Sequence, residues 1–386
     1  MGADSATRGW AGAHHPALDG IRGAAILVVI AHNGGWVLGE SPALAVRVAA
    51  ALTATGWLGV QLFFVLSGFL ITGLLLDAEG TPGALRTFLV RRALRILPLY
   101  YAFLIPILLF GPNLAWSAEW ADEVRREQWW YVFYLSNWIQ PLGNDIDGLS
   151  HLWSLAVEEQ FYLVWPLIVL AMTRERLLRL CALTVVATPI IRWALVDAGW
   201  PSQAAYQWTV ARWDALAMGA ALALLARDPA AWTRLRRYLP GAMAFAGILL
   251  LSLVLLRRGF QSQDLPVQVL GQTLVVLLSA GLVATGLEAP ERIGERVARP
   301  FLSRFLRMIG KYSYAMYIFH LPVHLLLQPY AIQVIHGIES SPRALALVAY
   351  LALLAMVSLG LARLSWKFIE RPSLAFRDRV APAPRG

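Results

Sequence analysis

The chain has 386 residues, of which 58% are hydrophobic and 15% are charged, and its mean hydropathy is +0.57. Because about a quarter of the residues of a soluble domain are charged, this composition excludes a soluble globular protein and indicates a polytopic membrane protein. The net charge of +9 does not indicate nucleic-acid binding, since the arginines lie in loops beside apolar segments. Loop arginines of this kind orient membrane helices and attract anionic lipid.

The predicted elements follow a small, polar N-terminal stretch. We expect residues 1–18 to form a flexible tail, residues 19–372 one membrane domain, and residues 373–386 a second flexible tail. Ten apolar segments are near the length that crosses a bilayer; they lie at 22–39, 56–76, 94–111, 153–172, 179–196, 206–226, 240–256, 266–287, 312–330 and 343–364. The sequence therefore predicts an all-α bundle of about ten transmembrane helices. The aromatic stretch 129–139 is too short to cross, so we expect an interfacial or re-entrant segment there.

Loop charges predict the orientation of the bundle. Arginine gathers in 77–95, 173–179, 227–239 and 288–311, whereas loop 112–152 is net acidic. The positive-inside rule then places both termini in the cytoplasm, with the protein in the plasma membrane.

The first predicted helix carries a polar turn and a single imidazole. Asp19-Gly20 and Arg22 open it, and an apolar run then leads to His32 and Asn33. An imidazole about ten residues into a membrane helix lies roughly 15 Å deep. Ionisable groups at such depth are costly and mark sites, and histidine suits proton transfer near neutral pH. The alternative is that His32 only hydrogen-bonds a neighbouring helix.

The helix predicted at 153–172 carries a second polar face. Ser154, Glu158 and Tyr162 recur at every fourth residue and share that face. In the predicted topology Glu158 and His32 both lie in the outer half of the membrane. We therefore expect the carboxylate to orient the imidazole and stabilise its protonated form. The alternative is a structural contact of Glu158 with an arginine or tyrosine, and Glu159 is expected to point elsewhere.

Arginines precede the third predicted helix at positions 91, 92 and 95. Arg92 and Arg95 are one turn apart, so both can face one ligand, and guanidinium groups suit phosphate. The alternative is that Arg91, Arg92 and Arg95 are topological anchors whose charges snorkel to the interface.

Other polar residues give weaker signals. Ser67 precedes Gly68, a pair that permits close helix packing, and no base for a serine nucleophile stands beside it. His320 and His324 have a metal-compatible spacing, yet no carboxylate or thiol accompanies them. The single cysteine, Cys181, excludes a disulfide or a cysteine-based metal cage. We expect packing or substrate contact from these histidines and no metal.

Taken together, these stretches resemble the acyltransferase-3 family of integral membrane acyltransferases. The matching segments occur in the family's order and cover almost the whole chain: Leu18–Gly23 with His32, Gly59–Ile71, Arg91–Pro98 with Tyr100 and Tyr101, Trp153–Tyr162, Gly310–His320 with Pro322, and Glu370–Pro372. The resemblance implies transfer of an acyl group from acyl-CoA to a hydroxyl of a sugar-containing acceptor. It assigns the essential histidine to His32, the arginine pair to Arg92 and Arg95, and the key acid to Glu158.

Two positions depart from the family's pattern. The family's arginine stands eleven residues before its histidine, whereas Arg22 stands ten before His32. Ten steps of 100° miss the shared helix face by roughly 80°. Gln61 stands where an acid is expected, so no carboxylate role is assigned there.

The sequence thus predicts a membrane-embedded O-acyltransferase with acetyl-CoA or a longer acyl-CoA as co-substrate and no tightly bound cofactor. His32 and Glu158 would be catalytic, Arg91, Arg92 and Arg95 would bind the donor phosphates, and support would come from Arg22, Asn33, Ser67, Ser154, Tyr162 and His320. The expected partners are the bilayer, a hydroxylated small molecule, macrolide or saccharide acceptor, and optionally a second copy of the chain in a homodimer. The alternative function is a proton-coupled exporter.

Overall fold

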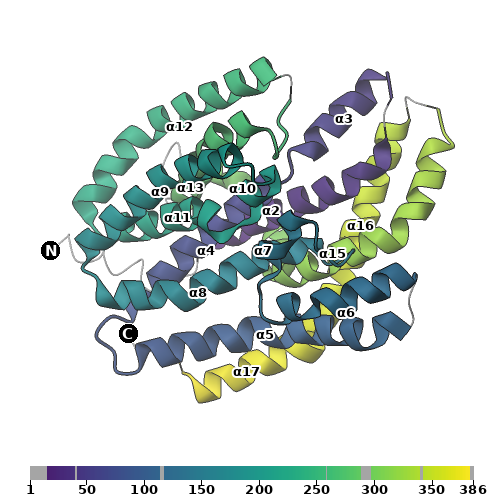
Figure 1. Ribbon diagram of the computed structural model, residues 1–386. Coiled ribbons are helices and arrows are strands. Elements are labelled where there is room, and N and C mark those ends of the chain that lie inside the picture. Colours follow the sequence, from purple (N-terminus) through teal and green to yellow (C-terminus); the bar gives the residue numbers. More distant parts are fainter. Residues whose placement is uncertain are drawn as a thin grey trace.

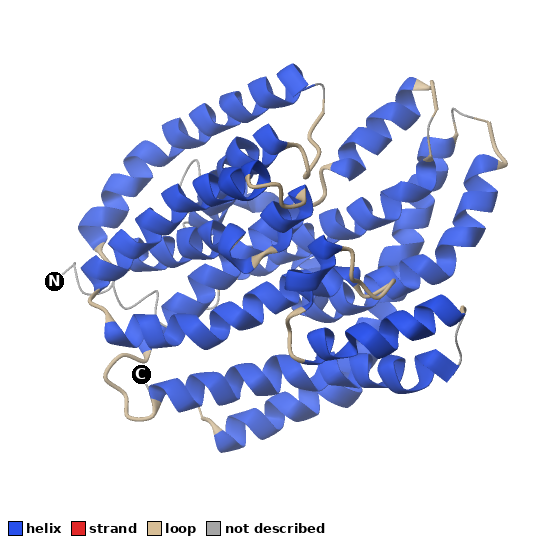
Figure 2. Ribbon diagram, in the orientation of Figure 1, coloured by secondary structure: helices blue, strands red, loops and turns tan. Residues whose placement is uncertain are grey.

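The computed structural model describes residues 15–39, 41–113, 117–257, 259–287, 297–339 and 342–382. Among these residues helices are the only regular secondary structure, and loops and turns connect them (Figure 2). Within this part of the chain, nine helical stretches are long and apolar enough to cross a membrane. The predicted all-α polytopic fold is therefore confirmed.

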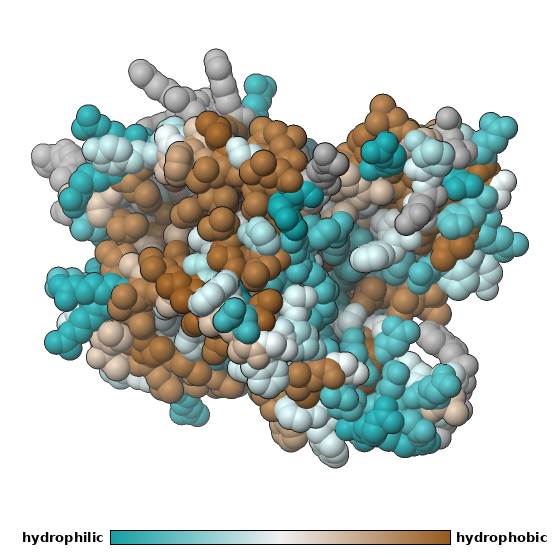
Figure 3. Space-filling view, turned by 45° about the horizontal axis from the view of Figure 1, so that its top comes forward, coloured by the Kyte–Doolittle hydropathy of each residue, from teal (hydrophilic) through white to brown (hydrophobic). Residues whose placement is uncertain are grey.

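The long helices pack into one bundle (Figure 1). In chain order the helices are α2 (Pro16–Gly34), α3 (Leu44–Ala54), α4 (Leu58–Asp77), α5 (Ala84–Phe110), α6 (Ala118–Val132), α7 (Ser136–Ile139), α8 (Trp153–Ala171), α9 (Arg174–Asp197), α10 (Ser202–Gln207), α11 (Trp213–Ala226), α12 (Pro229–Arg257), α13 (Gln272–Leu287), α15 (Arg304–His336), α16 (Arg343–Ser365) and α17 (Arg371–Val380). Hydrophobic side chains cover a large part of the molecular surface, as lipid contact requires (Figure 3).

One predicted span is wrong. The segment 206–226 is not a single helix, because the chain turns between α10 and α11. The buried Arg192 stabilises this turn by donating to the carbonyl oxygen of Ala211 at 2.8 Å and to the carboxylate of Asp214 at 2.5 Å. The resulting α11 spans Trp213–Ala226 and, at 1.5 Å per residue, is roughly 21 Å long. This is shorter than the hydrocarbon core of a bilayer.

The aromatic stretch 129–139 does not form a helix long enough to cross a bilayer, as predicted. It comprises the last turn of α6, a turn in which Tyr134 has a φ of 55°, and the short helix α7. The hydroxyls of Tyr100 and Tyr101 on α5 donate to the carbonyls of Tyr131 and Val132. The stretch is therefore fixed to α5, and its interfacial or re-entrant position in the membrane stays a prediction.

Helices extend into both predicted tails. Pro16 lies at the start of α2, where its missing N–H costs nothing, so the helix begins inside the predicted 1–18 tail. Most of 373–386, expected to be flexible, belongs to α17. This helix packs along α5, where Ser373 donates to the Leu94 carbonyl and Arg91 bonds to Asp378. Residues 1–14 and 383–386 lie outside the described residues.

Glycines bring two pairs of helices unusually close. A Cβ added at Gly310 of α15 would lie 1.8 Å from the Asp19 carbonyl oxygen of α2. A Cβ added at Gly219 of α11 would lie 2.0 Å from the Val65 carbonyl oxygen of α4. Such backbone contact is how membrane helices associate without a hydrophobic driving force. It fixes α2 against α15 and α4 against α11, and three of these helices carry the polar residues described below.

We call one end of the bundle the basic end. There α4, α8 and α11 finish and α5, α9 and α12 begin. Arg174 pairs with Glu79 at 3.0 Å, and Arg227 pairs with Asp77 at 2.7 Å. His32 lies near the C-terminal end of α2, whereas Arg22 lies near the helix start at the basic end.

A carboxyl in the loop before α8 predicts a pH-dependent stability. Burial raises the pKa of Asp145 from 3.8 to about 6, although the Tyr131 hydroxyl and the Ile146 N–H both donate to it. The folded protein then holds a proton that the unfolded chain releases near pH 4, so the contribution of Asp145 to the free energy of unfolding is highest below about pH 4 and falls as pH rises to about 6. The change Asp145→Asn should remove this dependence, measured as the thermal midpoint between pH 4 and 7. The exposed Asp122→Asn is the control, and an identical decline in Asp145→Asn would contradict the assignment.

Candidate active site

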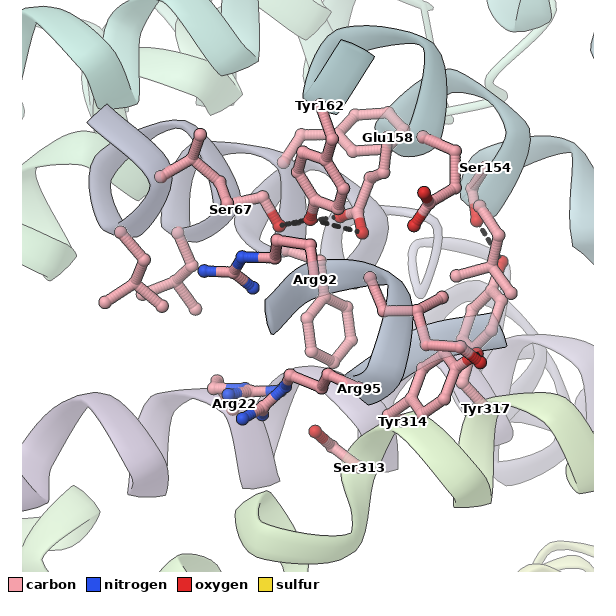
Figure 4. A pocket seen from close by; sticks show the side chains of 18 of the residues that line it. Arg22, Ser67, Arg92, Arg95, Ser154, Glu158, Tyr162, Ser313, Tyr314 and Tyr317 are labelled. Atoms are coloured by element: carbon pink, nitrogen blue, oxygen red, sulfur yellow. Dashed lines mark hydrogen bonds between the residues drawn. The ribbon is translucent and has the colours of Figure 1, made fainter. Parts of the chain in front are cut away.

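A polar pocket lies among α2, α4, α5, α8 and α15 (Figure 4). It is lined by Arg22, Val60, Phe63, Phe64, Leu66, Ser67, Leu70, Ile71, Arg92, Arg95, Ile96, Ser154, Leu155, Glu158, Glu159, Tyr162, Ser313, Tyr314 and Tyr317. The structure thus brings together seven predicted site residues from four helices. An apolar wall with a few converging polar groups is the usual form of a small-molecule site.

Glu158 is held in this pocket by hydroxyl donors. Ser67 donates to one carboxylate oxygen at 2.8 Å, and the Tyr162 hydroxyl lies 3.0 Å from the other (Figure 4). The same tyrosine hydroxyl lies 3.2 Å from Ser67. These bonds satisfy a half-buried carboxylate in an environment where an unpaired one would be costly. The prediction that Ser154, Glu158 and Tyr162 share a face holds, since all three line the pocket.

Three arginines form one side of the pocket. The Arg92 guanidinium stacks over the Tyr162 ring at 5.6 Å, and Arg22 and Arg95 lie beside each other (Figure 4). Arg22 and Arg95 also line a second pocket at the basic end, together with Arg304, Arg307 and Lys311. The two pockets therefore adjoin through these shared arginines. The second pocket, with its five cationic side chains, forms a cationic mouth that leads to Glu158.

Arg91 does not join this group. It donates to the Ala381 carbonyl at 2.6 Å and lies 3.4 Å from the Asp378 carboxylate, so it fastens α17 to α5. It was predicted to bind the donor with Arg92 and Arg95, but it lines neither pocket, for a geometric reason. Adjacent residues of a helix point about 100° apart, whereas Arg92 and Arg95, three residues apart, face the same side.

Glu159 and three residues of α15 complete the lining, and the sequence reading missed them. Glu159 was expected to point away, yet it lines the pocket beside Glu158. Ser313, Tyr314 and Tyr317 lie in the matched segment Gly310–His320, and their recurrence at three- and four-residue spacing was the available signal.

His32 lies outside the pocket, nearer the opposite end of the bundle. Its Nδ1 is 3.0 Å from the carbonyl oxygen of Thr53, the penultimate residue of α3. The carbonyl can only accept, so Nδ1 carries the proton and Nε2 keeps its lone pair. The predicted pairing of His32 with Glu158 is wrong, because each has other partners. The backbone carbonyl orients the imidazole, in the role expected of the carboxylate.

A layer of polar residues lies between the pocket and His32. The Ser154 hydroxyl meets the Tyr317 hydroxyl at 2.5 Å, and Tyr317 donates to the His151 carbonyl at 2.8 Å. His320 lies 2.6 Å from the Tyr317 carbonyl through Nδ1 and 2.8 Å from the Asn33 amide through Nε2. Asn33 and His320, both predicted as support, are therefore in direct contact, and Asn33 adjoins His32 in α2.

His151 is a second imidazole in this layer. It is buried, and its ring lies 5.2 Å from that of His320. Its Nε2 is 3.1 Å from the Ile318 carbonyl, and its Nδ1 has no hydrogen-bond partner among the residues that the structure describes. It stands directly before the Trp153–Tyr162 segment, but no spacing rule pointed to it. His32, which is half-buried, is the imidazole with better access to an incoming substrate.

The fold and the site define a multi-pass membrane protein with a cationic mouth that opens on a buried polar pocket. The acyltransferase domain matches residues 15–363, and the chain belongs to this acyltransferase-3 family. The predicted family resemblance is confirmed.

Curated relatives cover almost all of this chain. A Bacillus subtilis protein, YrhL, whose name assigns it provisionally as a peptidoglycan O-acetyltransferase, is 31% identical across 93% of this chain and 55% of its own length. The peptidoglycan O-acetyltransferase OatA of Listeria monocytogenes is 27% identical across 92% of this chain and 55% of its own. The O-acetyltransferase OatA of Staphylococcus aureus is 27% identical across 92% of this chain and 57% of its own. This chain thus spans little more than half the length of these relatives. No solved structure matches it.

Proposed function

We propose that this protein is a membrane-embedded O-acyltransferase that moves a short acyl group, such as acetyl, from acyl-CoA to a hydroxyl of a saccharide. The observation that carries the proposal is the pair of adjoining pockets that share Arg22 and Arg95. Five cationic side chains around the mouth suit the phosphates of a nucleotide-bearing thioester. The narrower, apolar-walled pocket behind them suits the pantetheine arm and the acyl group.

In this proposal the basic end faces the cytoplasm, as the positive-inside rule favours, and both termini lie there. The donor then enters from the cytoplasm, and its thioester reaches the level of Ser154 and Tyr317. The acceptor approaches His32 from the opposite side of the membrane. The thioester and the acceptor hydroxyl would meet at the polar layer formed by Asn33, His151 and His320.

The transfer itself needs a base and a donor to the developing oxyanion. His32 Nε2 would take the proton of the acceptor hydroxyl while its oxygen attacks the thioester carbonyl. A carbon–oxygen bond forms, the carbon–sulfur bond breaks, and the proton passes to the leaving thiolate. Asn33 or Ser154 would donate a hydrogen bond to the oxyanion. Glu158, bonded to Ser67 and Tyr162, would hold the donor pocket in shape and balance the charge of Arg92.

The names of the relatives favour a saccharide acceptor. Those of YrhL and the Listeria OatA specify peptidoglycan. We therefore propose a glycan hydroxyl as the first acceptor to test, with a macrolide-type acceptor as the second.

The decisive assay follows the release of CoA. Purified protein in detergent should convert acetyl-CoA and a peptidoglycan fragment to free CoA and an O-acetylated product, detected as a thiol and by mass spectrometry. Glu158→Gln should lower kcat at least tenfold, because it removes the charge opposite Arg92 while keeping the side-chain shape. Turnover that requires both substrates supports the proposal. A proton-coupled exporter would release no CoA, and that result with a panel of acyl donors and acceptors would refute it.

A further inference from the structure

A buried arginine lies outside the pocket with part of its guanidinium unused. Arg212 precedes α11 and is 0% exposed. Its Nη1 donates to the side-chain oxygen of Gln272 at 2.5 Å. Its Nε and Nη2 have no hydrogen-bond partner among the residues that the structure describes. These two atoms form one edge of the planar guanidinium, the edge that binds carboxylates and other anions in a bidentate manner.

Aromatic rings enclose this cation. The guanidinium carbon lies 5.0 Å from the ring centre of Tyr206, 5.1 Å from that of Phe64 and 5.5 Å from that of Trp153. The faces of these rings stabilise the positive charge, but the rings provide no hydrogen-bond acceptor for the N–H groups of Nε and Nη2. They also keep the environment apolar, which makes an unbalanced charge more costly than it would be in water.

The nearby carboxylate, that of Asp214, already has a cationic partner. Asp214 bonds to Arg192 at 2.5 Å, and both side chains are 0% exposed. Two buried arginines therefore share one buried carboxylate, which leaves a net positive charge, since arginine does not give up its proton in proteins. The N-terminus of α11 adds the positive end of its helix dipole at the same place.

The neighbouring amides also favour a negative ligand. Gln61 donates to the side-chain oxygen of Gln272 at 3.3 Å. The Gln272 amide nitrogen has no hydrogen-bond partner within the described part of the chain, and neither has the Gln61 oxygen. Of the four unpaired groups in this cluster, three are N–H donors. Water could occupy the donors, but it would leave the charge unbalanced.

We propose that Arg212 and Gln272 form a binding site for one small monovalent anion of the size of chloride, and that Gln61 holds Gln272 in place through its hydrogen bond without contacting the anion. We call it the Arg212 site. The anion would accept hydrogen bonds from Nε and Nη2 of Arg212 and from the amide of Gln272. It would neutralise the positive charge where α4, α11 and α13 meet. Gln61 belongs to α4, Gln272 begins α13, and Arg212 directly precedes α11. Phe64, which encloses the guanidinium, also lines the polar pocket, so the site supports one wall of that pocket.

The test compares anions at constant ionic strength. The thermal midpoint of the purified full chain in detergent is measured in sodium chloride, nitrate, acetate and gluconate, the last being the bulkiest of the four anions. A ligand that binds only the folded protein raises the midpoint. We expect a saturable rise with chloride over gluconate, and a rise with nitrate or acetate as well would support the same class of ligand. Equal midpoints in chloride and gluconate would overturn the proposal.

Two substitutions at one position provide the control. Gln61→Glu places a carboxylate one hydrogen bond from Gln272 and next to Arg212, so the chloride-dependent rise should disappear. Gln61→Met adds no charge, so the rise should persist. A rise that survives in Gln61→Glu would contradict the Arg212 site. If Gln61→Glu fails to fold, binding of radioactive chloride to the parental protein decides: saturable binding near one ion per chain supports the site, and none refutes it.

Discussion

Replacing His32 with glutamine is expected to abolish acyl transfer and leave the fold intact. Glutamine keeps a donor for the Thr53 carbonyl, which His32 meets at 3.0 Å through Nδ1, but it offers no basic nitrogen. Loss of a general base costs about 10²- to 10⁴-fold in rate. The measurement is kcat for acetyl transfer by purified protein, with the thermal midpoint recorded on the same preparation.

His336→Gln is the matched control for this change. His336 lies at the end of α15 and meets the Val37 carbonyl at 3.2 Å, so it is also a histidine bonded to backbone near the same end of the bundle. Its replacement should leave kcat unchanged. Near-normal turnover by folded His32→Gln would eliminate His32 as the base. His151, whose Nδ1 is unpaired within the described structure, would then be the next imidazole to replace.

The double change Arg92→Gln and Arg95→Gln is expected to raise the KM for acyl-CoA at least tenfold. Hydrogen bonds to charged groups contribute about 1.5–3 kcal/mol each, so the loss of one or two corresponds to a tenfold change or more. The salt dependence of KM should flatten, because the lost contacts are those that salt screens. Lysine at either position should restore affinity only in part, since it keeps the charge without the planar fork. The KM for the acceptor should change little.

Arg91→Gln is the control for the arginine pair. Arg91 lies on the same helix but bonds to Ala381 and Asp378 of the C-terminal segment. Its loss should lower the thermal midpoint slightly and leave the KM for acyl-CoA unchanged. If Arg92 and Arg95 are only topological anchors, their double change will instead reduce the yield in membranes at an unaltered KM. That outcome would remove them from the donor site.

The sequence by itself determined the class of the protein and much of one wall of the site. Apolar segments of bilayer length imply membrane helices, because a buried backbone must satisfy its hydrogen bonds within each helix. Helical spacing alone was enough to group Ser154 with Glu158 and Tyr162, and Arg92 with Arg95. It also separated Arg22 from His32, since their spacing puts them on different faces of α2. Of the residues that this spacing grouped or separated, all except His32 line the pocket.

Tertiary structure decided which of these faces meet. Close contact at Gly310 sets α2 against α15 and brings Asn33 to His320, a pairing across 287 residues that no local spacing encodes. Close contacts at Gly35 and Gly56 place Thr53 beside His32, whereas Glu158 bonds to Ser67 and Tyr162, so the expected His32–Glu158 pair does not form. The broken span at 206–226 has a similar cause. Hydropathy counts apolar residues, whereas the turn before α11 depends on Arg192 reaching Asp214 from another helix.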